Sequence, residues 1–420
     1  MKKPELLILV LALLATVAKV YCAWTTIGTA DVGLFREFGH TISDRGLTAM
    51  YRETPLFNHT PLVGTFTGFA YDLSGGQGRP FARIMRAPGI VADLLSVFVL
   101  LWLRRRTGRP AWWALALFAV SPVSFMVSGF HGNVDPLVPL ALLLAAAACV
   151  GGEAALCGLC IGLACQVKVI PVLLAPVFFF HWWHRDKARA FTATAAVTGV
   201  IGWLLPLLTL PGVFLKNVVG YSSIWGVWGI TYLLRLTDAP ALRGIVFTTL
   251  TPTQAAVIAA LKVIVIGGVL ALAWRRRAGD VLATLALAWL VFFVFAPGFG
   301  VQYLVWPAPF FLFLSARWSA AMTAAGSIAL FAFYTICAHG LPWDKAFLVQ
   351  QAAPQWTPWL LLPWATFAAC LGAQAFGLRA KAEPLTNLPA PADAAGQDQA
   401  VALTRQTQLA DGNVTAMPGQ

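Results

Sequence analysis

Charged residues are scarce in this sequence. Only 11% of its 420 residues are Asp, Glu, Lys or Arg, whereas 59% are hydrophobic and the mean hydropathy is +0.74. Because an ordinary soluble domain carries about 25% charged residues, this composition excludes that class. Apolar runs recur from Leu6 to Phe376, and a membrane-spanning helix needs about 20 mostly apolar residues. Only helices or closed barrels satisfy their backbone groups in lipid, so we predict an all-α polytopic membrane protein with about twelve transmembrane helices.

The chain also lacks a solvated basic domain or stripe, although its formal net charge is +12. Nucleic-acid binding would need such a surface, so we predict no nucleic-acid partner. Much of the positive charge lies in three short basic loops, RRRTGR at 104–109, HRDKAR at 184–189 and RRR at 275–277. Short loops rich in Lys and Arg remain cytoplasmic, which predicts that both termini are cytoplasmic.

No group of His, Cys and carboxylate residues has the spacing of a dedicated metal site. Cys157 and Cys160 are two residues apart, but no second pair or His follows, which favours small residues at a helix interface. We therefore predict no certain cofactor, while a lipid phosphate could recruit a divalent cation such as Mg or Mn with few protein ligands.

The N-terminus, MKKPELLILVLALLATVAKVYCAW, has the positive start and apolar core of a signal peptide. We interpret it as an uncleaved signal anchor with Lys19 snorkelling to the far interface, the alternative being cleavage near Ala23. Residues 1–379 are expected to form the transmembrane domain. Residues 380–420 are rich in Pro, Ala and polar residues and are expected to form a disordered cytoplasmic tail. Spans are expected at about 6–22, 83–103, 110–129, 134–150, 154–167, 169–183, 190–210, 252–273, 281–296, 302–315, 319–337 and 358–377.

A long outside segment, residues 23 to about 82, gathers ionisable residues and is expected to carry interfacial helices. Asp31 precedes an apolar helix face of Leu34, Phe35 and Phe38 that can lie on the membrane. Asp31 is either a helix N-cap or a catalytic base. The segment and its continuation also hold arginines that suggest an anionic partner, the alternatives being lipid headgroups or neighbouring carboxylates. These are Arg36, Arg45, Arg52, Arg79, Arg83 and Arg86.

Asn58 and His59 lie between two prolines, which stiffen a loop that presents polar groups or forms an ordinary turn. Ionisable groups at membrane depth are costly and mark candidate functional sites, here Asp93, Asp135 and Lys168. The alternative for Asp93 is a structural ion pair or amide partner, and for Lys168 it is snorkelling.

The polar stretch FHGNVDP at 130–136 interrupts an apolar run and places His131, Asn133 and Asp135 together. It either lines a site or forms an exposed turn with Asp135 as a helix cap. Farther along, Gln302 and Tyr303 lie at the outer end of a late span. An aromatic belt explains Tyr303 and the nearby Trp306 without a substrate, whereas Gln302 is harder to dismiss.

These motifs, in this order, resemble the GT-C-fold membrane glycosyltransferases, most closely bacterial mannosyltransferase-like members that use polyprenyl-phosphate sugars. The likeness extends over about residues 1 to 380. It is carried by an Asp after the first span, GLTAMY before FNHTPL, RAPGIVAD, HGNVDP, KVIPVLLAP and QYLVWPAP. The resemblance implies that Asp31 is the general base; because Val32 follows it where many members have a second acidic residue, Glu37 and Asp44 remain alternatives.

The resemblance further implies inverting transfer of a sugar, mannose as a family-level expectation, from a polyprenyl-phosphate donor to a hydroxyl of a lipid, glycan or protein. Arg86, Lys168 and His59 are candidates for holding the lipid phosphate, and His131, Asn133 and Asp135 for lining the sugar site. The site is expected on the outer side of a bacterial inner membrane. A transporter or a lipid-linked-sugar flippase is the alternative, and it would predict a midplane site and related halves. A polymerase or ligase of lipid-linked glycans and a non-catalytic subunit also remain open.

Overall fold

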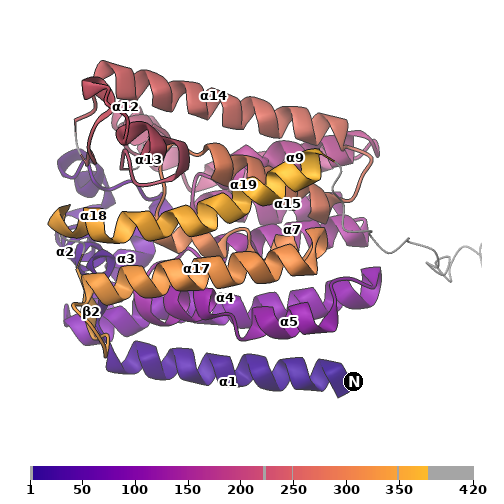
Figure 1. Ribbon diagram of the computed structural model, residues 1–420, viewed down its shortest axis with the longest axis horizontal. Coiled ribbons are helices and arrows are strands. Elements are labelled where there is room, and N and C mark those ends of the chain that lie inside the picture. Colours follow the sequence, from indigo (N-terminus) through magenta and orange to yellow (C-terminus); the bar gives the residue numbers. More distant parts are fainter. Residues whose placement is uncertain (1–2, 221–223, 248, 348–349, 377–420) are drawn as a thin grey trace, which may run out of the picture. The chain divides into compact units, whose positions relative to one another are not determined.

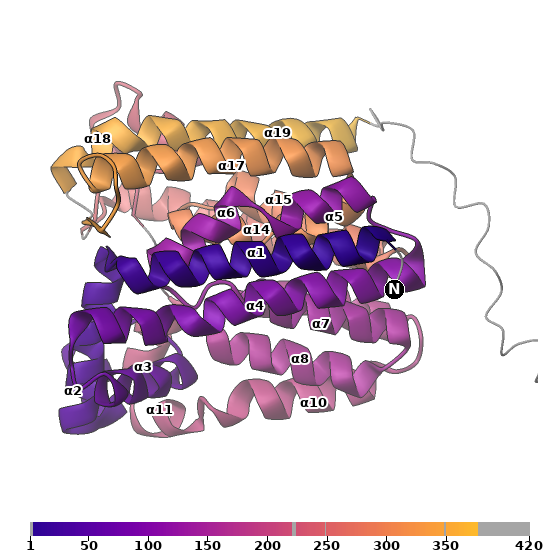
Figure 2. The ribbon, with the colours of Figure 1, turned by 90° about the horizontal axis from the view of Figure 1, so that it is seen from below.

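The computed structural model describes residues 3–220, 224–247, 249–347 and 350–376. The described part is almost entirely helical, and its long helices run side by side (Figures 1 and 2). This confirms the prediction of an all-α polytopic membrane protein. The predicted disordered tail, residues 380–420, lies outside the described residues.

Helices lie at every range in which a span is expected. They are α1 (Lys3–Thr25), α4 (Gly78–Thr107), α5 (Trp112–Ala119), α6 (Pro122–Ser124), the π-helix η1 (Phe125–His131), α7 (Leu137–Gly151), α8 (Ala154–Val167), α9 (Pro171–Trp183), α10 (Ala188–Ile201), α11 (Leu204–Thr209), α14 (Pro252–Arg275), α15 (Val281–Phe295), η4 (Val301–Val305), α16 (Ala308–Leu314), α17 (Ala316–Cys337), α18 (Ala353–Trp356), η6 (Thr357–Leu360) and α19 (Leu361–Ala375).

Five helical stretches of the described chain are long and apolar enough to cross a membrane by themselves. They are Lys3–Thr25, Gly78–Thr107, Trp112–His131, Pro252–Arg275 and Ala316–Cys337. Each of the other expected spans is either one shorter apolar helix or two short helices that follow one another. A total of twelve crossings therefore stays a prediction.

The remaining elements form the connections at one end of the bundle (Figure 1). They are β1 (Gly28–Thr29), α2 (Ala30–Glu53), α3 (Pro61–Leu73), α12 (Pro211–Phe214), η2 (Leu215–Val219), α13 (Gly229–Arg235), η3 (Pro240–Leu242), β2 (Lys345–Ala346) and η5 (Gln350–Ala352). β1 and β2 pair in parallel and join the start of the first outside segment to the connection after α17.

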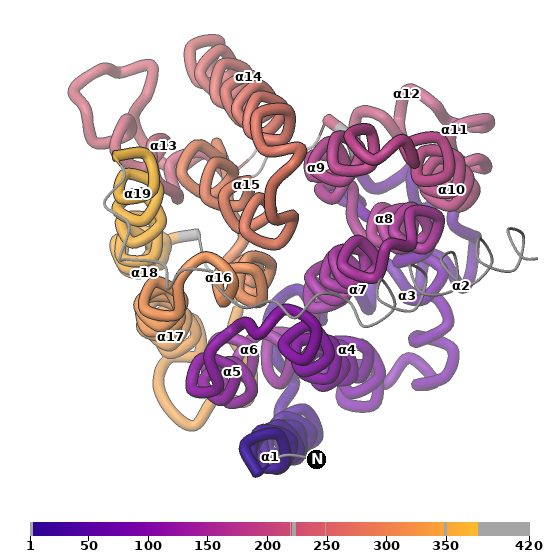
Figure 3. The backbone as a smooth tube through the Cα atoms, turned by 90° about the vertical axis from the view of Figure 1, so that its right-hand side faces the viewer, coloured from indigo at the N-terminus to yellow at the C-terminus, as the bar shows by residue number. Residues whose placement is uncertain are grey.

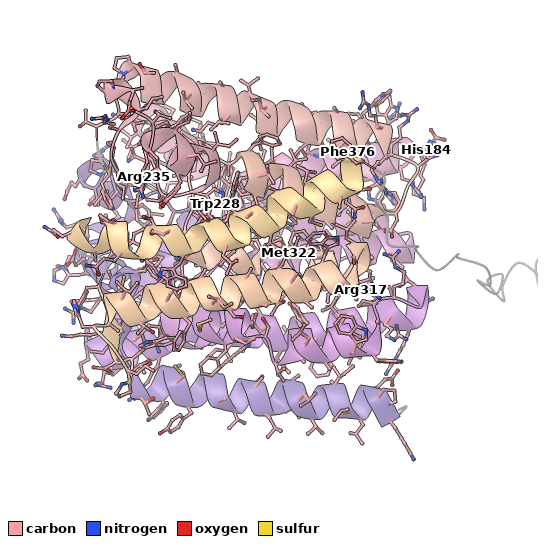
Figure 4. All side chains as sticks on the ribbon, viewed as in Figure 1. His184, Trp228, Arg235, Arg317, Met322 and Phe376 are labelled. Carbon is pink, nitrogen blue, oxygen red and sulfur yellow. The ribbon has the colours of Figure 1, made fainter. Side chains whose placement is uncertain are left out.

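The three basic loops lie together at the other end. Arg105 pairs with Glu5 of α1 at 2.9 Å, and Arg109 pairs with Asp280, beside the loop at 275–277, at 2.9 Å. Lys187 donates to the carbonyl of Gly152 at 3.2 Å. Figure 4 shows His184 and Arg317 at this end and Arg235 towards the opposite one. The three basic loops therefore lie at the same end of the bundle. The predicted topology requires this, because it places all three on the cytoplasmic side.

The first outside segment departs from its predicted form. Phe35 and Phe38 of α2 are each only 2% exposed. They pack against the loop that follows α2, where Phe38 meets Phe57 with ring centroids 5.2 Å apart. The prediction that this apolar face lies on the membrane is therefore wrong: the face forms a small core inside the protein.

Lys19 does not snorkel, contrary to the prediction. Its side chain is 5% exposed, and its Nζ lies 2.6 Å from Asp93 Oδ2 and 2.6 Å from Ser124 Oγ. Ser128 donates to the same carboxylate oxygen. A charge buried among helices is tolerable when it is paired, so Asp93 has a structural partner, and that partner is a lysine of α1.

Candidate active site

Asp31 lies in the first turn of α2, at the end of the bundle opposite the basic loops. Its Oδ2 accepts a hydrogen bond from Asn133 Nδ2 at 3.0 Å and lies 3.0 Å from His131 Nε2. Thr29, and not Asp31, is the N-cap residue of α2, and its hydroxyl donates to the His131 carbonyl at 2.7 Å. Asp31 is therefore not a cap, and its 36% exposed side chain faces the stretch FHGNVDP.

His131 is held on both sides. Its Nδ1 lies 2.9 Å from the hydroxyl of Tyr334 in α17, and its ring is 4% exposed. Both ring nitrogens are thus occupied, which makes His131 a residue that orients Asp31. The second carboxylate oxygen of Asp31, Oδ1, has no hydrogen-bond partner among the described residues. It is the atom left to receive a proton.

The close approach of FHGNVDP to α2 depends on Gly132. This residue follows the π-helix η1 with φ of 86°, in the left-handed region that glycine adopts without strain. A Cβ at this position would lie 2.3 Å from Val32 Cγ2. Glycine therefore allows His131 and Asn133 to reach Asp31. Asn133 is oriented in turn, because its Oδ1 accepts from the Val134 amide at 2.7 Å.

The protonation states of Asp31 and His59 follow from their surroundings. Burial favours the neutral carboxyl of Asp31, but the charge of His131 and the hydrogen bonds from His131 and Asn133 outweigh it, lowering its pKa to about 2. Burial, followed by the positive charge of Lys168, lowers the pKa of His59 to about 3, against the opposing influence of Asp31. At neutral pH the site therefore presents a carboxylate and a neutral imidazole.

A second cluster contains Asp135, Lys168 and Trp306. Asp135 is fully buried, and its Oδ1 accepts from Lys168 Nζ at 2.6 Å and from Trp306 Nε1 at 2.8 Å. The Lys168 ammonium also lies 4.7 Å from the ring centre of Tyr303, which stacks on Trp306. Asp135 thus orients the Lys168 ammonium, while the Lys168 side chain remains 17% exposed.

His59 connects the two clusters. It lies in the loop between α2 and α3, next to Thr60, whose hydroxyl donates to the carbonyl of Gln166, two residues before Lys168. The His59 ring packs on Phe35 with centroids 4.7 Å apart, and its carbonyl accepts from the Tyr51 hydroxyl at 2.7 Å. Its neighbour Asn58 is half-buried, with no hydrogen bond to its side chain among the described residues.

Arg86 lies between the end of α1 and η1, and its side chain is 0% exposed. Its guanidinium donates to the Gly129 carbonyl at 3.0 Å, to the Thr26 hydroxyl at 2.9 Å and to the Thr26 carbonyl at 3.0 Å. It also donates to the Ile27 carbonyl. Arg86 thereby joins the end of α1 to η1, and the structure gives it no opening towards a phosphate.

The remaining candidates lie apart from Asp31. Asp93 is held by Lys19 between α1, α4 and η1. Gln302 is half-buried in η4, and Gly300 lies so close to it that an added Cβ would be 2.8 Å from Gln302 Oε1. Tyr303 borders Lys168, as described above. The structure thus brings Asp31, His59, His131, Asn133, Asp135 and Lys168 to one place.

Two residues that hold the site, Tyr334 and Trp306, were not predicted to have that role. Tyr334 is fully buried in α17 and orients His131. Trp306 is 2% exposed, and its hydrogen bond to Asp135 shows that its interpretation as part of an interfacial belt is wrong. A hydroxyl near the end of an apolar helix was the only available signal for Tyr334. In the described residues, no group of three or more His, Cys, Asp or Glu side chains could hold a metal ion.

The comparisons with known proteins show the family of the chain. Residues 80–297 match the model of glycosyltransferase family 87, and no curated protein matches the chain. The fold and this match define a membrane glycosyltransferase, consistent with the GT-C type. Because the match covers more than half of the chain, the protein belongs to glycosyltransferase family 87. The matched range includes His131, Asp135 and Lys168, whereas Asp31 and His59 precede it.

Proposed function

We propose that this protein transfers a sugar from a polyprenyl-phosphate donor to an acceptor hydroxyl, with inversion at the anomeric carbon and with Asp31 as the general base. The observation that supports this most directly is the Asp31 carboxylate, which is fixed through Oδ2 by His131 and Asn133 and open at Oδ1. Mannose is the family-level expectation for the sugar, and the acceptor is a lipid, a glycan or a protein.

One carboxylate suffices for a single displacement. The acceptor oxygen forms a bond to the anomeric carbon while the bond from that carbon to the phosphate oxygen breaks. The hydroxyl proton passes to Asp31 Oδ1, and the lipid phosphate leaves with the electron pair. Because the pKa of Asp31 is low, about 2, it takes the proton only when the acceptor oxygen has become acidic by bonding to carbon.

The leaving phosphate needs a positive charge, and Lys168 is our proposed source. An ammonium has three donors, of which one goes to Asp135 and leaves two for phosphate oxygens. The neutral His59 borders the same space and is our second candidate. A divalent cation such as Mg or Mn would be carried chiefly by the donor phosphate. We retain Asn58, Gln302 and Tyr303 as candidate substrate-binding residues at the edge of the site. We no longer propose that Arg86 and Asp93 bind substrate, because residues of the protein itself surround their charged groups.

We propose that the site faces the outside of a bacterial inner membrane, with twelve crossings and both termini in the cytoplasm. The shared end of the three basic loops supports this orientation, because short basic loops stay cytoplasmic and Asp31 lies at the other end. Among the described residues, the buried pair of Lys19 and Asp93 favours the alternative, a transporter or flippase of lipid-linked sugars.

Sugar transfer tests the proposal. Membranes carrying the native chain, Asp31→Asn or Glu37→Gln would be given a panel of radiolabelled polyprenyl-phosphate sugars with lipid and glycan extracts. Glu37, the alternative base on the same helix, is exposed, so Glu37→Gln serves as the comparison that separates the two candidates. We expect labelled product with the native chain and Glu37→Gln and a loss of about 100-fold or more with Asp31→Asn, the scale of general base catalysis. Equal transfer by Asp31→Asn would exclude Asp31 as the base. Movement of labelled donor across the bilayer without product would favour the flippase.

A further inference from the structure

Two segments of the chain run side by side towards the proposed base. Residues 26–31 follow α1 and end at Asp31, and residues 129–133 form the end of η1 and the turn after it. The segments are joined near Asp31, where the Thr29 hydroxyl donates to the His131 carbonyl at 2.7 Å and His131 Nε2 lies 3.0 Å from Asp31 Oδ2. The position of one segment along the other therefore decides whether Asp31 and His131 meet.

Arg86 joins the same two segments at their other end. Its Nη1 donates to the Gly129 carbonyl at 3.0 Å and to the Thr26 hydroxyl at 2.9 Å, and its Nη2 donates to the carbonyls of Thr26, at 3.0 Å, and of Ile27. Figure 3, which looks along the bundle, shows α1 at the edge of the bundle beside α4, the helix that carries Arg86. One guanidinium on a third helix thus holds the start of both segments.

Between Arg86 and Asp31 the two segments touch at Gly28. Its backbone has a φ of 100°, in the left-handed region that favours glycine. A Cβ at this position would lie 2.5 Å from the Phe130 carbonyl oxygen and 2.8 Å from Arg86 Nη2. The segments are therefore in contact along the whole distance from Arg86 to Asp31, so a shift at one end displaces the other.

The oxygens around Arg86 explain why this position needs a guanidinium. Thr26 and Ile27 follow the end of α1, and Gly129 lies near the end of η1, so their carbonyls are groups that a helix leaves without partners at its C-terminus. Arg86 is 0% exposed, so these oxygens, and not water, compensate its charge. A lysine has one nitrogen in place of a planar fork of donors and cannot hold the same set of oxygens.

We propose that Arg86 is a positioning residue for the reaction: it sets the register of the two segments in which Asp31 meets His131. The inference rests on the proposed function, in which Asp31 is the base. It adds a residue that acts through the backbone of the two segments and takes no part in holding the donor.

The pH dependence of sugar transfer tests this role. Arg86→Lys keeps a positive charge but loses the planar donors, so the segments shift and kcat falls about 10-fold or more. Asp31 then loses the contacts with His131 and Asn133 that lower its pKa to about 2, so its pKa rises and the acid limb of kcat moves to higher pH. Thr26→Val removes only one of the acceptors and moves the limb in the same direction by less.

Arg83 provides the matched control. It precedes Arg86 by about one turn of α4 and also holds the end of α1, because it donates to the Trp24 carbonyl at 3.2 Å and lies 3.9 Å from the centre of the Trp24 ring. Among the described residues it makes no hydrogen bond to η1. Arg83→Lys should therefore keep the native acid limb.

Two kinetic results would overturn the inference while leaving the proposed function intact. One is a lower kcat in Arg86→Lys with the acid limb at its native pH. The other is an equal loss of kcat and an equal shift of the limb in Arg83→Lys, which would show a general effect of the attachment of α1 to α4.

A spectroscopic measurement tests the same register without sugar transfer. An ionised carboxylate only accepts hydrogen bonds, so His131 Nε2 donates a proton to Asp31, and this N–H belongs to a ring that is 4% exposed. Full-length protein in detergent, with a nitrogen isotope in its six histidines, should show the N–H as a separate magnetic resonance signal that is absent in His131→Gln. We expect the native signal in Arg83→Lys and a shifted or missing signal in Arg86→Lys.

The outcomes separate the two proposals. An unchanged signal in Arg86→Lys, or no such signal in the native protein, overturns the positioning role of Arg86. The expected pattern of signals without any sugar transfer would support the register and remove the proposed function alone.

Discussion

His131 and Asp31 are 100 residues apart in the chain, and their side chains meet with His131 Nε2 3.0 Å from Asp31 Oδ2. Tyr334 holds the opposite nitrogen of the same ring, so three distant parts of the sequence form one row of side chains. The row ends at the free Oδ1 of Asp31. This arrangement fixes the direction of the carboxylate and lowers its pKa.

Loss of His131 should therefore change both the rate and its pH dependence. In His131→Gln the Asp31 carboxylate loses the charge and the bond that lower its pKa to about 2, so its pKa rises. Because only the ionised carboxylate is a base, the acid limb of kcat moves to higher pH, and kcat at neutral pH falls about 10- to 100-fold. Tyr334→Phe should shift the limb in the same direction by less. An acid limb at the native pH in His131→Gln would contradict the orienting role.

Gly132 tests the approach of FHGNVDP to α2. An added methyl would meet Val32 at 2.3 Å and would have to adopt a φ of 86°. Gly132→Ala should therefore displace His131 and reduce kcat by about 10-fold or more, since small misplacements of catalytic groups are costly. Gly152→Ala is the control, because Gly152 has a φ of 83° but nothing within 4 Å of the added Cβ. Equal losses in both variants would show that backbone strain alone, and not the contact with Val32, is responsible.

Lys168 should act on donor binding. Lys168→Met removes the ammonium and leaves Asp135 buried without its cation, whereas Lys168→Arg keeps a positive charge. We expect KM for the donor to rise about 10- to 100-fold in Lys168→Met, equivalent to the ~1.5–3 kcal/mol of a charged hydrogen bond, with partial recovery in Lys168→Arg. Lys187→Met, at the end of the basic loops, should have native kinetics. A change in the KM of the acceptor only would contradict the assignment of Lys168 to the phosphate.

Lys19 and Asp93 form a buried ion pair, and each charge should be tolerated only while the other is present. Removing one partner leaves an uncompensated charge, so Lys19→Met or Asp93→Asn should each cost about 3–5 kcal/mol of unfolding free energy. The double variant removes both charges and should be more stable than either single variant. Thermal unfolding of purified protein in detergent measures all four forms. Additive losses in the double variant would show that the two residues do not depend on each other.

Some of the site could be predicted from the sequence because its residues violate the local pattern. His131, Asn133, Asp135 and Lys168 are polar groups that interrupt apolar runs, and polar groups at membrane depth need a reason. The role of Asp31, in a segment rich in ionisable residues, was expected from the family resemblance instead. Asp93 stood out by the same signal and proved to have Lys19 as its partner. The signal thus detects buried polarity without distinguishing an active site from a structural ion pair.

Arg86 and Trp306 show what could not be predicted. A sequence does not state whether a guanidinium meets a phosphate or oxygens of the protein itself, and Arg86 meets three backbone carbonyls and the Thr26 hydroxyl. Trp306 matched an interfacial belt by position, yet its indole binds Asp135. In both cases the partners lie far away in the sequence, and they meet only through the packing of the helices.

The sequence by itself determined the class of the fold, the places of the helices and the charge that orients them. These properties follow from the favourable transfer of apolar runs into lipid and from the cytoplasmic preference of short basic loops. Both depend on residues that are neighbours in the sequence. Only the tertiary structure decided which polar residues meet. Hydrogen bonds and ion pairs act over a few ångströms, so Asp31 met His131, and Lys168 met Asp135, only when parts of the chain far apart in sequence had packed together.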